Sequence, residues 1–251
     1  MKTTNHTVLI TGGGSGIGLA IARLLSEQGN QVIITGRNEA KLQQAAAALP
    51  GVTPIAFDVN DAAAVAQRIE AEFGGLSLLI NNAGYADAYE LLPGAGAYAI
   101  AEAEIHTNYL AIVRLTEALL PVLTRQPEAA VVNVSSIVAF VPSAGIPTYA
   151  ASKAALHSYT QSLRHTLSQH APNVKVFDLM PPLVDTELSA GIGGASGIAP
   201  RQVAEELLTA LAQDTYEIHV GQTAGLYQLF HADPAQAFAT MNSSLRAAEA
   251  H

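Results

Sequence analysis

Apolar and polar positions along the chain fall into two alternating patterns. Short, continuously apolar runs predict buried strands at residues 6–11, 31–35, 53–57, 76–80, 130–134 and 174–179. Between them, apolar residues recur at helical spacing and predict helices at residues 17–29, 39–49, 61–73, 98–123 and 148–170. Strands that lack polar alternation and are separated by helices are typical of a parallel sheet covered on both faces. The pattern therefore predicts a doubly wound α/β fold.

We expect one domain over residues 1–251, because no shift in composition marks a linker and no segment repeats. The stretch SAGIGGASGIAP (189–200) is rich in glycine, serine and alanine. This composition predicts a mobile loop, of use in substrate binding, at about residues 186–200. The last part of the chain, about residues 222–251, is expected to form a helical tail.

Composition and charge exclude several classes of partner. Hydrophobic residues make up 49% and charged residues 13% of the chain, which favours a large buried core over disorder. The net charge is −9 and no basic run is present, so nucleic acid and membrane surfaces are not expected partners. The absence of cysteine, of a signal-peptide core and of a long apolar run leads us to expect a cytoplasmic protein. The eight histidines show no metal-ligand spacing beyond His165 and His170, which are five apart near a helix end, and no metal is expected.

A glycine-rich turn, TGGGSGIG (11–18), joins the first predicted strand to the first predicted helix. Gly12, Gly16 and Gly18 follow the spacing G-x-x-x-G-x-G. Glycine lets the backbone come close to a pyrophosphate, and a helix N-terminus supplies N–H donors for an anion. The alternative is a glycine-rich turn without a ligand. Its place between a strand and a helix favours dinucleotide binding.

Polar side chains follow two other predicted strands at the point where each strand ends. NNAG (81–84) comes after the fourth predicted strand, and Ser135 and Ser136 come after the fifth. Open α/β sheets bind their ligands beyond the carboxyl ends of the strands. We therefore expect these residues to share a binding crevice with the glycine loop.

A tyrosine and a lysine stand one helical turn apart in PTYAASKAAL (147–156). Tyr149 and Lys153 would project from the same face of the predicted helix. Taken alone, such a pair is more often a solvated face with an extended lysine. Asn108 lies inside another predicted helix, where asparagine is a mediocre helix former and often serves a function or a cap.

Together these motifs resemble the short-chain dehydrogenase/reductase family. The resemblance rests on TGGGSGIG, NNAG, Asn108, Ser136 and YAASK, in that order, and extends from about residue 7 to residue 221. Within the family, the run LMPPLVDTEL and the C-terminal tail resemble the DltE-like uncharacterised oxidoreductases. The resemblance implies a Rossmann fold with a seven-stranded parallel sheet in the order 3-2-1-4-5-6-7.

The resemblance also implies roles for four residues. Tyr149 would be the general acid that protonates a carbonyl oxygen during reduction. Lys153 would lower the pKa of Tyr149 by its positive charge and would bind the nicotinamide ribose. Ser136 would hold the substrate oxygen, and Asn108 would anchor a water in a proton relay.

A larger set of residues would hold a nicotinamide cofactor on the same basis. Asp58 would meet the adenine, Asn81, Ala83 and Gly84 would line the adenine ribose, and Val184 and Thr186 would hold the carboxamide. The implied cofactor residues are Gly12, Gly14, Ser15, Gly16, Ile17, Gly18, Arg37, Asn38, Asp58, Val59, Asn81, Ala83, Gly84, Tyr149, Lys153, Pro181, Val184 and Thr186. Pro182 departs from the family, which commonly has glycine at this position.

The residues after the second strand, TGRN (35–38), bear on the choice of cofactor. NAD enzymes of this fold place a carboxylate there to bind the ribose 2′-hydroxyl. This chain has Gly36 and Arg37, and a guanidinium can bind a 2′-phosphate. We therefore predict NADP as cofactor, with Ser15 and Asn38 assisting, and NAD as the second possibility. The alternative is that Arg37 is merely a solvent-exposed side chain on a turn.

The predicted substrate pocket offers apolar walls and no cation beyond Lys153. The residues expected to face the substrate are Ser136, Phe140, Ile146, Tyr149, Pro182 and Leu183. A neutral ketone, aldehyde or alcohol fits such walls, because a buried anion would lack a partner. The rival functions are a non-catalytic dinucleotide-sensing protein and an epimerase or dehydratase on the same fold. By family resemblance we expect a homodimer or a homotetramer.

Overall fold

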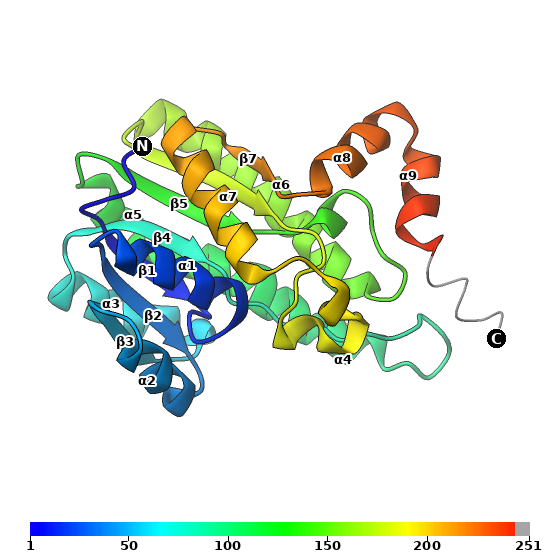
Figure 1. Cartoon of the computed structure of the whole chain (residues 1–251), viewed down its shortest axis with the longest axis horizontal. Coiled ribbons are helices and arrows are strands. Elements are labelled where there is room, and N and C mark those ends of the chain that lie inside the picture. The colour runs from blue at the N-terminus through cyan, green and yellow to red at the C-terminus, as the bar shows by residue number, and fades with distance from the viewer. Residues whose placement is uncertain (244–251) are drawn as a thin grey trace.

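Parallel strands form one sheet in the order β3-β2-β1-β4-β5-β6-β7. These seven strands are β1 (Thr7–Thr11), β2 (Gln31–Gly36), β3 (Val52–Ala56), β4 (Leu76–Asn81), β5 (Ala129–Val134), β6 (Val174–Met180) and β7 (Glu217–His219). The computed structural model describes residues 1–243 and confirms the predicted sheet and its order (Figure 1). The order reverses between β1 and β4, and this reversal opens a crevice at the carboxyl edge of the sheet.

The central strands are buried on both faces, as their continuously apolar sequences require. Every residue of β4 and of β5 is buried. β7 is the strand that the hydrophobic pattern did not locate. It has three residues at the edge of the sheet and only its central Ile218 is buried, so it carries no apolar run.

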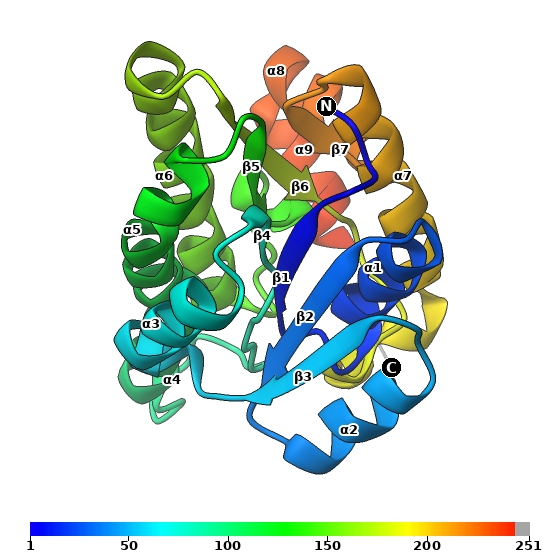
Figure 2. The ribbon, with the colours of Figure 1, turned by 90° about the vertical axis from the view of Figure 1, so that its left-hand side faces the viewer.

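Helices cover both faces of the sheet (Figure 2). One face packs against α1 (Gly16–Glu27), α2 (Glu39–Ala47) and α7 (Pro200–Gln213). The other packs against α3 (Ala62–Glu72), α5 (Ala111–Thr124) and the end of α6 (Pro147–His170). Alternate residues of one strand serve the two faces, because successive side chains of a strand point to opposite sides. In β1, Val8 and Ile10 join the first core and Leu9 joins the second.

The predicted helix over residues 98–123 is interrupted. It consists of α4 (Ala97–Ile105), a π-helical segment (His106–Leu110) and α5. π-Helical segments inside longer helices are frequent at functional sites. Asn108 lies within this one, so the break falls at a residue for which we expected a function.

The segments after β6 complete the crevice. The predicted loop at 186–200 contains two short 3₁₀-helical turns, Glu187–Ile192 and Gly194–Ser196, before α7 begins at Pro200. α8 (Thr223–Ala232) and α9 (Pro234–Met241) follow β7 and stand together at one end of the molecule (Figure 1). The predicted helical tail beyond residue 243 lies outside the described residues. Within residues 1–243, no helix has the length and apolar character needed to cross a membrane.

Candidate active site

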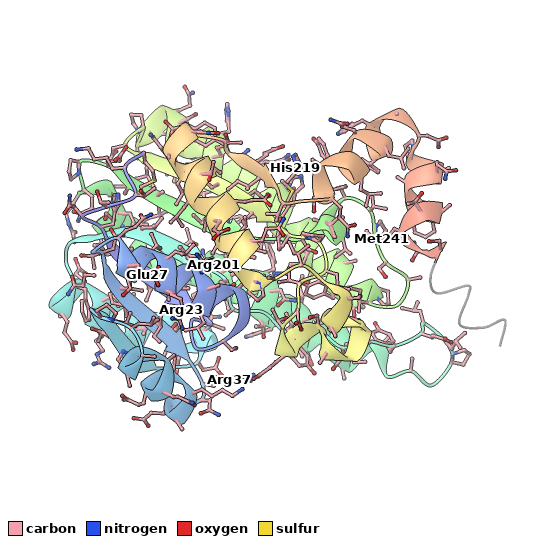
Figure 3. All side chains as sticks on the ribbon, viewed as in Figure 1. Arg23, Glu27, Arg37, Arg201, His219 and Met241 are labelled. Carbon is pink, nitrogen blue, oxygen red and sulfur yellow. The ribbon has the colours of Figure 1, made fainter. Side chains whose placement is uncertain are left out.

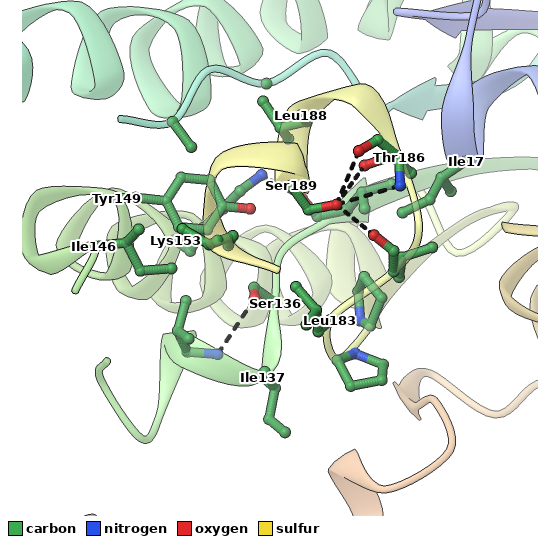
Figure 4. Close-up of a pocket in the computed structure, with 18 of the residues that line it drawn as sticks. Ile17, Ser136, Ile137, Ile146, Tyr149, Lys153, Leu183, Thr186, Leu188 and Ser189 are labelled. Carbon is green, nitrogen blue, oxygen red and sulfur yellow. Dashed lines mark hydrogen bonds between the residues drawn. The ribbon is translucent and has the colours of Figure 1, made fainter. Parts of the chain in front are cut away.

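A cavity of about 620 Å³ lies at the carboxyl edge of the sheet (Figure 4). The glycine loop, the ends of β4 and β5, the first turns of α6 and the segment after β6 all contribute to its walls. Fifteen of the residues predicted from the sequence line it: Gly12, Ser15, Gly16, Ile17, Ala83, Gly84, Ser136, Ile146, Tyr149, Lys153, Pro181, Pro182, Leu183, Val184 and Thr186. One cavity therefore brings together the predicted cofactor, catalytic and substrate residues.

The glycine loop requires glycine at two positions for backbone reasons. Gly12 has φ +66°, and a Cβ there would lie 3.0 Å from the Cα of Ala83. Gly16 has φ +53°, and a Cβ there would lie 3.1 Å from Cγ2 of Thr186. Both backbones are left-handed, a conformation that side chains disfavour. The loop thus leaves space at the start of α1, whose unpaired N–H groups suit a pyrophosphate.

Asn82 holds the glycine loop in place, a role that we did not predict for it. Its Nδ2 donates to the carbonyl oxygens of Thr11 at 3.0 Å and Gly12 at 3.2 Å. In return, Thr11 Oγ1 accepts from the backbone N–H groups of Asn82 and Ala83, each at 3.0 Å. These bonds tie the end of β4 to the loop. The signal was present in the sequence as the second asparagine of NNAG.

Asn81 points away from the cavity into the core. Its Nδ2 donates to Thr116 Oγ1 at 3.1 Å and to Asn133 Oδ1 at 2.8 Å. The side chain is buried between β4, β5 and α5. The resemblance placed Asn81 beside the adenine ribose, but in this structure its side chain cross-links the sheet to a helix.

Ser136, Tyr149 and Lys153 face a common space (Figure 4). Ser136 lies just past the end of β5, where its hydroxyl accepts from the N–H of Val138 at 3.3 Å. Lys153 is almost fully buried, and its Nζ donates to the carbonyl oxygen of Val134 at 2.8 Å. The same Nζ lies 5.5 Å from the centre of the Tyr149 ring. The C-terminal end of β5 and the first turns of α6 therefore bring these three side chains to the same part of the cavity.

Burial governs the proton affinities of the pair. It raises the pKa of Tyr149 well above its usual value, although a hydrogen bond with Ser136 opposes the rise and the charge of Glu104 adds to it. Burial also lowers the pKa of Lys153 to about 8, with the charge of Asp178 acting in the opposite direction. We expected Lys153 to lower the pKa of Tyr149. In this structure the pKa of Tyr149 is raised instead, with the burial of the phenol as the largest cause.

Asn108 is fully buried and clamps the loop that follows NNAG. Its Oδ1 accepts from the N–H of Tyr85 at 2.8 Å, and its Nδ2 donates to Tyr85 O at 2.8 Å and to Ser152 Oγ at 2.9 Å. One turn earlier, the buried Glu104 accepts from the N–H of Asp87 at 3.0 Å. These contacts fix the loop beside Lys153 and give the asparagine in the π-helical segment a positioning task.

The residues expected near the adenine lie along the edge of the crevice. Arg37 is exposed just after β2 (Figure 3). A hydrogen bond with Asp87 raises the pKa of Tyr85, and the positive charge of Arg37 opposes that rise. Asn38 caps α2, because its side chain accepts from the N–H of Lys41 at 3.0 Å.

Other predicted cofactor residues lie outside the lining of the cavity. Asp58 and Val59 follow β3, where a short 3₁₀ turn (Val59–Asp61) begins. Gly14 and Gly18 belong to the glycine loop but back onto protein, since a Cβ at Gly14 would lie 3.3 Å from Leu42 and one at Gly18 would meet Asn82. Their contribution is to the shape of the turn.

Phe140 does not line the cavity, contrary to our expectation. Its ring packs against those of Tyr227, Phe230 and His219, with ring centres 5.1, 6.0 and 6.2 Å apart. It thus supports α8 behind the site. In its place the structure brings Met241 from α9, about a hundred residues further along the chain.

Asn242 fastens the end of α9 to the cavity wall. Its Oδ1 accepts from the N–H of Ala144 at 2.7 Å, and its Nδ2 donates to the carbonyl oxygen of Pro142 at 3.1 Å. Ser143, Gly145 and Ile146 of the same segment line the cavity. No sequence pattern signalled this contact, because it joins distant parts of the chain.

Charged groups are scarce in the cavity lining. It contains Lys153 and Glu187, and the latter pairs with Lys41 at 2.6 Å. The remaining lining is mostly apolar or small, with Ile137, Ile146, Leu183 and Leu188 among its larger members. In the described part of the chain, no group of three or more histidine, aspartate or glutamate residues could hold a metal ion. The lining favours a neutral ligand beside the reactive residues.

Comparison with known proteins gives consistent matches. The profile of a family described as short chain dehydrogenase matches residues 6–211. The uncharacterized oxidoreductase DltE of Bacillus subtilis is 39% identical, with 97% of this chain and 99% of DltE covered. A short chain dehydrogenase from Burkholderia cenocepacia, solved in complex with NADP, is 29% identical with a TM-score of 0.86, covering 96% of this chain and 99% of its own. Another from Sphingobium yanoikuyae, in complex with NADPH, is 28% identical with a TM-score of 0.76, covering 91% and 95%.

Proposed function

The chain belongs to the short-chain dehydrogenase family, and from this we propose that it catalyses reversible hydride transfer between NADP(H) and a neutral carbonyl or alcohol. The observation that carries the proposal is the shared cavity, in which the glycine loop lies beside Ser136, Tyr149 and Lys153. A non-catalytic dinucleotide sensor would have no use for these three side chains around a pocket of substrate size.

Tyr149 is proposed to donate the proton to the carbonyl oxygen. Its raised pKa keeps the phenol protonated at neutral pH, which suits the reduction direction. Ser136 stands close enough to hydrogen-bond the phenol and is placed to hold the same substrate oxygen. When bound, the nicotinamide supplies or accepts the hydride.

Lys153 is proposed to restore the proton of Tyr149 and to bind the ribose of the nucleotide. A lysine with a pKa of about 8 can release and regain a proton close to neutral pH. Its Nζ lies under the end of β5, where it bonds the carbonyl oxygen of Val134. Asn108 positions the loop around Tyr85, which lies next to Lys153. In our proposal it also positions the water that connects Lys153 to solvent.

The cofactor assignment rests on the fit of the glycine loop and of the edge residues. Gly12, Ser15 and Gly16 are proposed to hold the pyrophosphate, and Thr186, whose side chain abuts Gly16, the carboxamide. Arg37 is proposed to bind the 2′-phosphate, because its cation projects at the end of β2 where a carboxylate would select NAD. The bound NADP of the Burkholderia relative and the bound NADPH of the Sphingobium relative support this assignment.

The substrate is proposed to be a neutral ketone or aldehyde of small to medium size. Ile146, Pro182 and Leu183 would contact it, with Met241 in the place that we had assigned to Phe140. A carboxylate or phosphate on the substrate would find Lys153 as its one cation among the described residues of the lining and would be repelled by Glu187, which is already paired with Lys41.

The test is a panel of neutral ketones, aldehydes and secondary alcohols, followed by the absorbance of reduced nicotinamide with each cofactor. Tyr149→Phe should abolish nearly all turnover and leave the affinity for NADPH largely intact, because it removes one proton and little volume. Retention of more than about a tenth of the wild-type kcat would contradict the role of Tyr149, since loss of an acid costs roughly 10²-fold or more. Faster turnover of an acyl thioester or a phosphorylated sugar than of every neutral ketone would contradict the substrate class.

A further inference from the structure

A buried carboxylate lies behind the reactive lysine and is not used in the proposed chemistry. Asp178, in β6, is fully buried. One of its oxygens accepts from the hydroxyl of Ser135, and the other lies 2.7 Å from Nδ1 of His157. A buried carboxylate is costly unless it is paired and hydrogen-bonded, so its retention next to the site calls for an explanation.

The contacts of Asp178 close a ring through the reactive lysine. Ser135 directly follows Val134, whose carbonyl oxygen accepts from Lys153 Nζ at 2.8 Å. His157 lies one turn after Lys153 on α6 and therefore on the same face. The ring thus passes from Lys153 to the end of β5, across to β6 and back to α6. Val134 bonds the ammonium directly, and the other members reach it through Val134 and the turn of α6.

The charges in the ring respond to pH. The carboxylate of Asp178 raises the pKa of Lys153 against the effect of burial, and its hydrogen bond raises the pKa of His157. The other charged groups that face His157 are Glu217 on β7, which raises this pKa further, and Arg164 on α6, which lowers it. His219 on β7 also lies within electrostatic range of His157 and Asp178.

The net charge behind Lys153 therefore changes as His157 titrates. At low pH the imidazolium neutralises Asp178. At higher pH a neutral imidazole still donates from Nδ1 to the carboxylate, while its Nε2 can accept from the Gln161 amide 3.2 Å away. The uncompensated negative charge then appears in the pH range where a buried lysine would otherwise lose its proton.

We propose that Asp178 and His157 form a pH-responsive counter-charge that positions Lys153 and keeps it protonated as the pH rises. The proposal rests on the proposed function only where it concerns turnover. Asp178 and His157 are positioning residues, since they touch Lys153 through Ser135, Val134 and the turn of α6. A purely structural tether between α6 and β6 is the competing explanation, and it predicts no dependence of the Lys153 titration on these two residues.

Two variants separate these explanations. In Asp178→Asn, the side chain can still accept the hydrogen bond from His157, but it no longer carries a negative charge. His157→Asn places an amide donor near the position of Nδ1 and removes the positive charge while leaving the carboxylate. With the counter-charge, Asp178→Asn lowers the alkaline apparent pKa of kcat/KM for reduction by roughly half a unit or more. His157→Asn leaves that alkaline limb in place, because Asp178 remains an anion there.

A titration of Lys153 by lysine NMR gives the decisive readout without any substrate. The signal is assigned by its loss in Lys153→Met, and thermal unfolding confirms that each variant folds. A Lys153 pKa that falls in Asp178→Asn and not in His157→Asn supports the proposal. Equal Lys153 pKa values in wild type and Asp178→Asn overturn it, as would equal falls in both variants. If Asp178→Asn does not fold, Asp178→Ser takes its place, since it also removes the carboxylate, and a Lys153 pKa equal to that of the wild type then overturns the proposal. Inactivity of the wild type on every carbonyl would count against the proposed function and leave this titration unaffected.

Discussion

Lys153 is predicted to destabilise the fold that it serves. Its side chain is 3% exposed, and burial lowers its pKa from 10.5 to about 8. In the folded chain the ammonium therefore binds its proton more weakly than in the unfolded chain. Below pH 8 this difference costs stability in full, and the cost disappears as the pH rises from 8 toward 10.5.

The size of the effect follows from the two pKa values. The pKa of Lys153 is lower by about 2.5 in the folded chain than in the unfolded chain. One pKa unit corresponds to about 1.36 kcal/mol, so the cost in folding free energy at neutral pH is about 3 kcal/mol. Lys153→Met keeps most of the apolar stem and removes this cost. It also leaves the carbonyl oxygen of Val134 without its donor, which costs about 1 kcal/mol. The expected net gain is about 2 kcal/mol, or a rise in Tm of roughly 4–8 °C for a chain of this size.

The assay is thermal unfolding of wild type and Lys153→Met at pH 7 and at pH 10.5, in the absence of nucleotide. The gain should be present at pH 7 and lost at pH 10.5, and the variant should be inactive at both. Lys175→Met is the matched control, because the bond of Lys175 to Asp214 at 2.9 Å raises the pKa of this partly buried lysine. A raised pKa contributes stability below 10.5, so this variant should lose stability at pH 7. A lower Tm for Lys153→Met at pH 7 would refute the reasoning.

Three further outcomes are expected. The wild type should prefer NADPH over NADH by roughly tenfold or more in kcat/KM, and Arg37→Ala should reduce the preference; an unchanged ratio in steady-state kinetics would remove the 2′-phosphate role. Asn242→Ala should lower the unfolding free energy by about 1–2 kcal/mol, because the backbone groups of Ala144 and Pro142 both lose their hydrogen bonds to this side chain, and should raise KM more than it lowers kcat; an unchanged KM would show that α9 does not shape the pocket. Light scattering at micromolar concentration should show a dimer or a tetramer, and a monomer would contradict both.

The sequence alone determined the sheet and most of the residues around the cavity. Mostly apolar runs located six strands, because a strand in a sheet that is covered on both faces is apolar at most of its positions. The glycine loop and Ser136 were predictable as one site because parallel strands deliver their carboxyl ends to the same edge, whereas Tyr149 and Lys153 were assigned to it by family resemblance. These inferences depend on the local pattern of hydrophobic residues and on the order of strands and helices along the chain, and both can be read from the sequence.

Only the tertiary structure decided which polar groups turn toward the cavity. Asn81 and Asn82 are adjacent and identical, yet Asn81, the last residue of β4, bonds Asn133 in the core, while Asn82, just past the strand, bonds the glycine loop. The π-helical interruption of the long helix at Asn108 was also not predictable from the sequence. Asn108 bonds Tyr85, which lies more than twenty residues away along the chain.

Distance in sequence and burial explain the remaining differences. Phe140 was expected in the substrate wall and lies behind it, while Met241 reaches the cavity from the far end of the chain. The proton affinity of Tyr149 and the ring through Asp178 depend on how deeply each group is buried and on what charge faces it. A sequence states which ionisable groups exist, but desolvation and Coulomb energies depend on separations that only the packed chain sets.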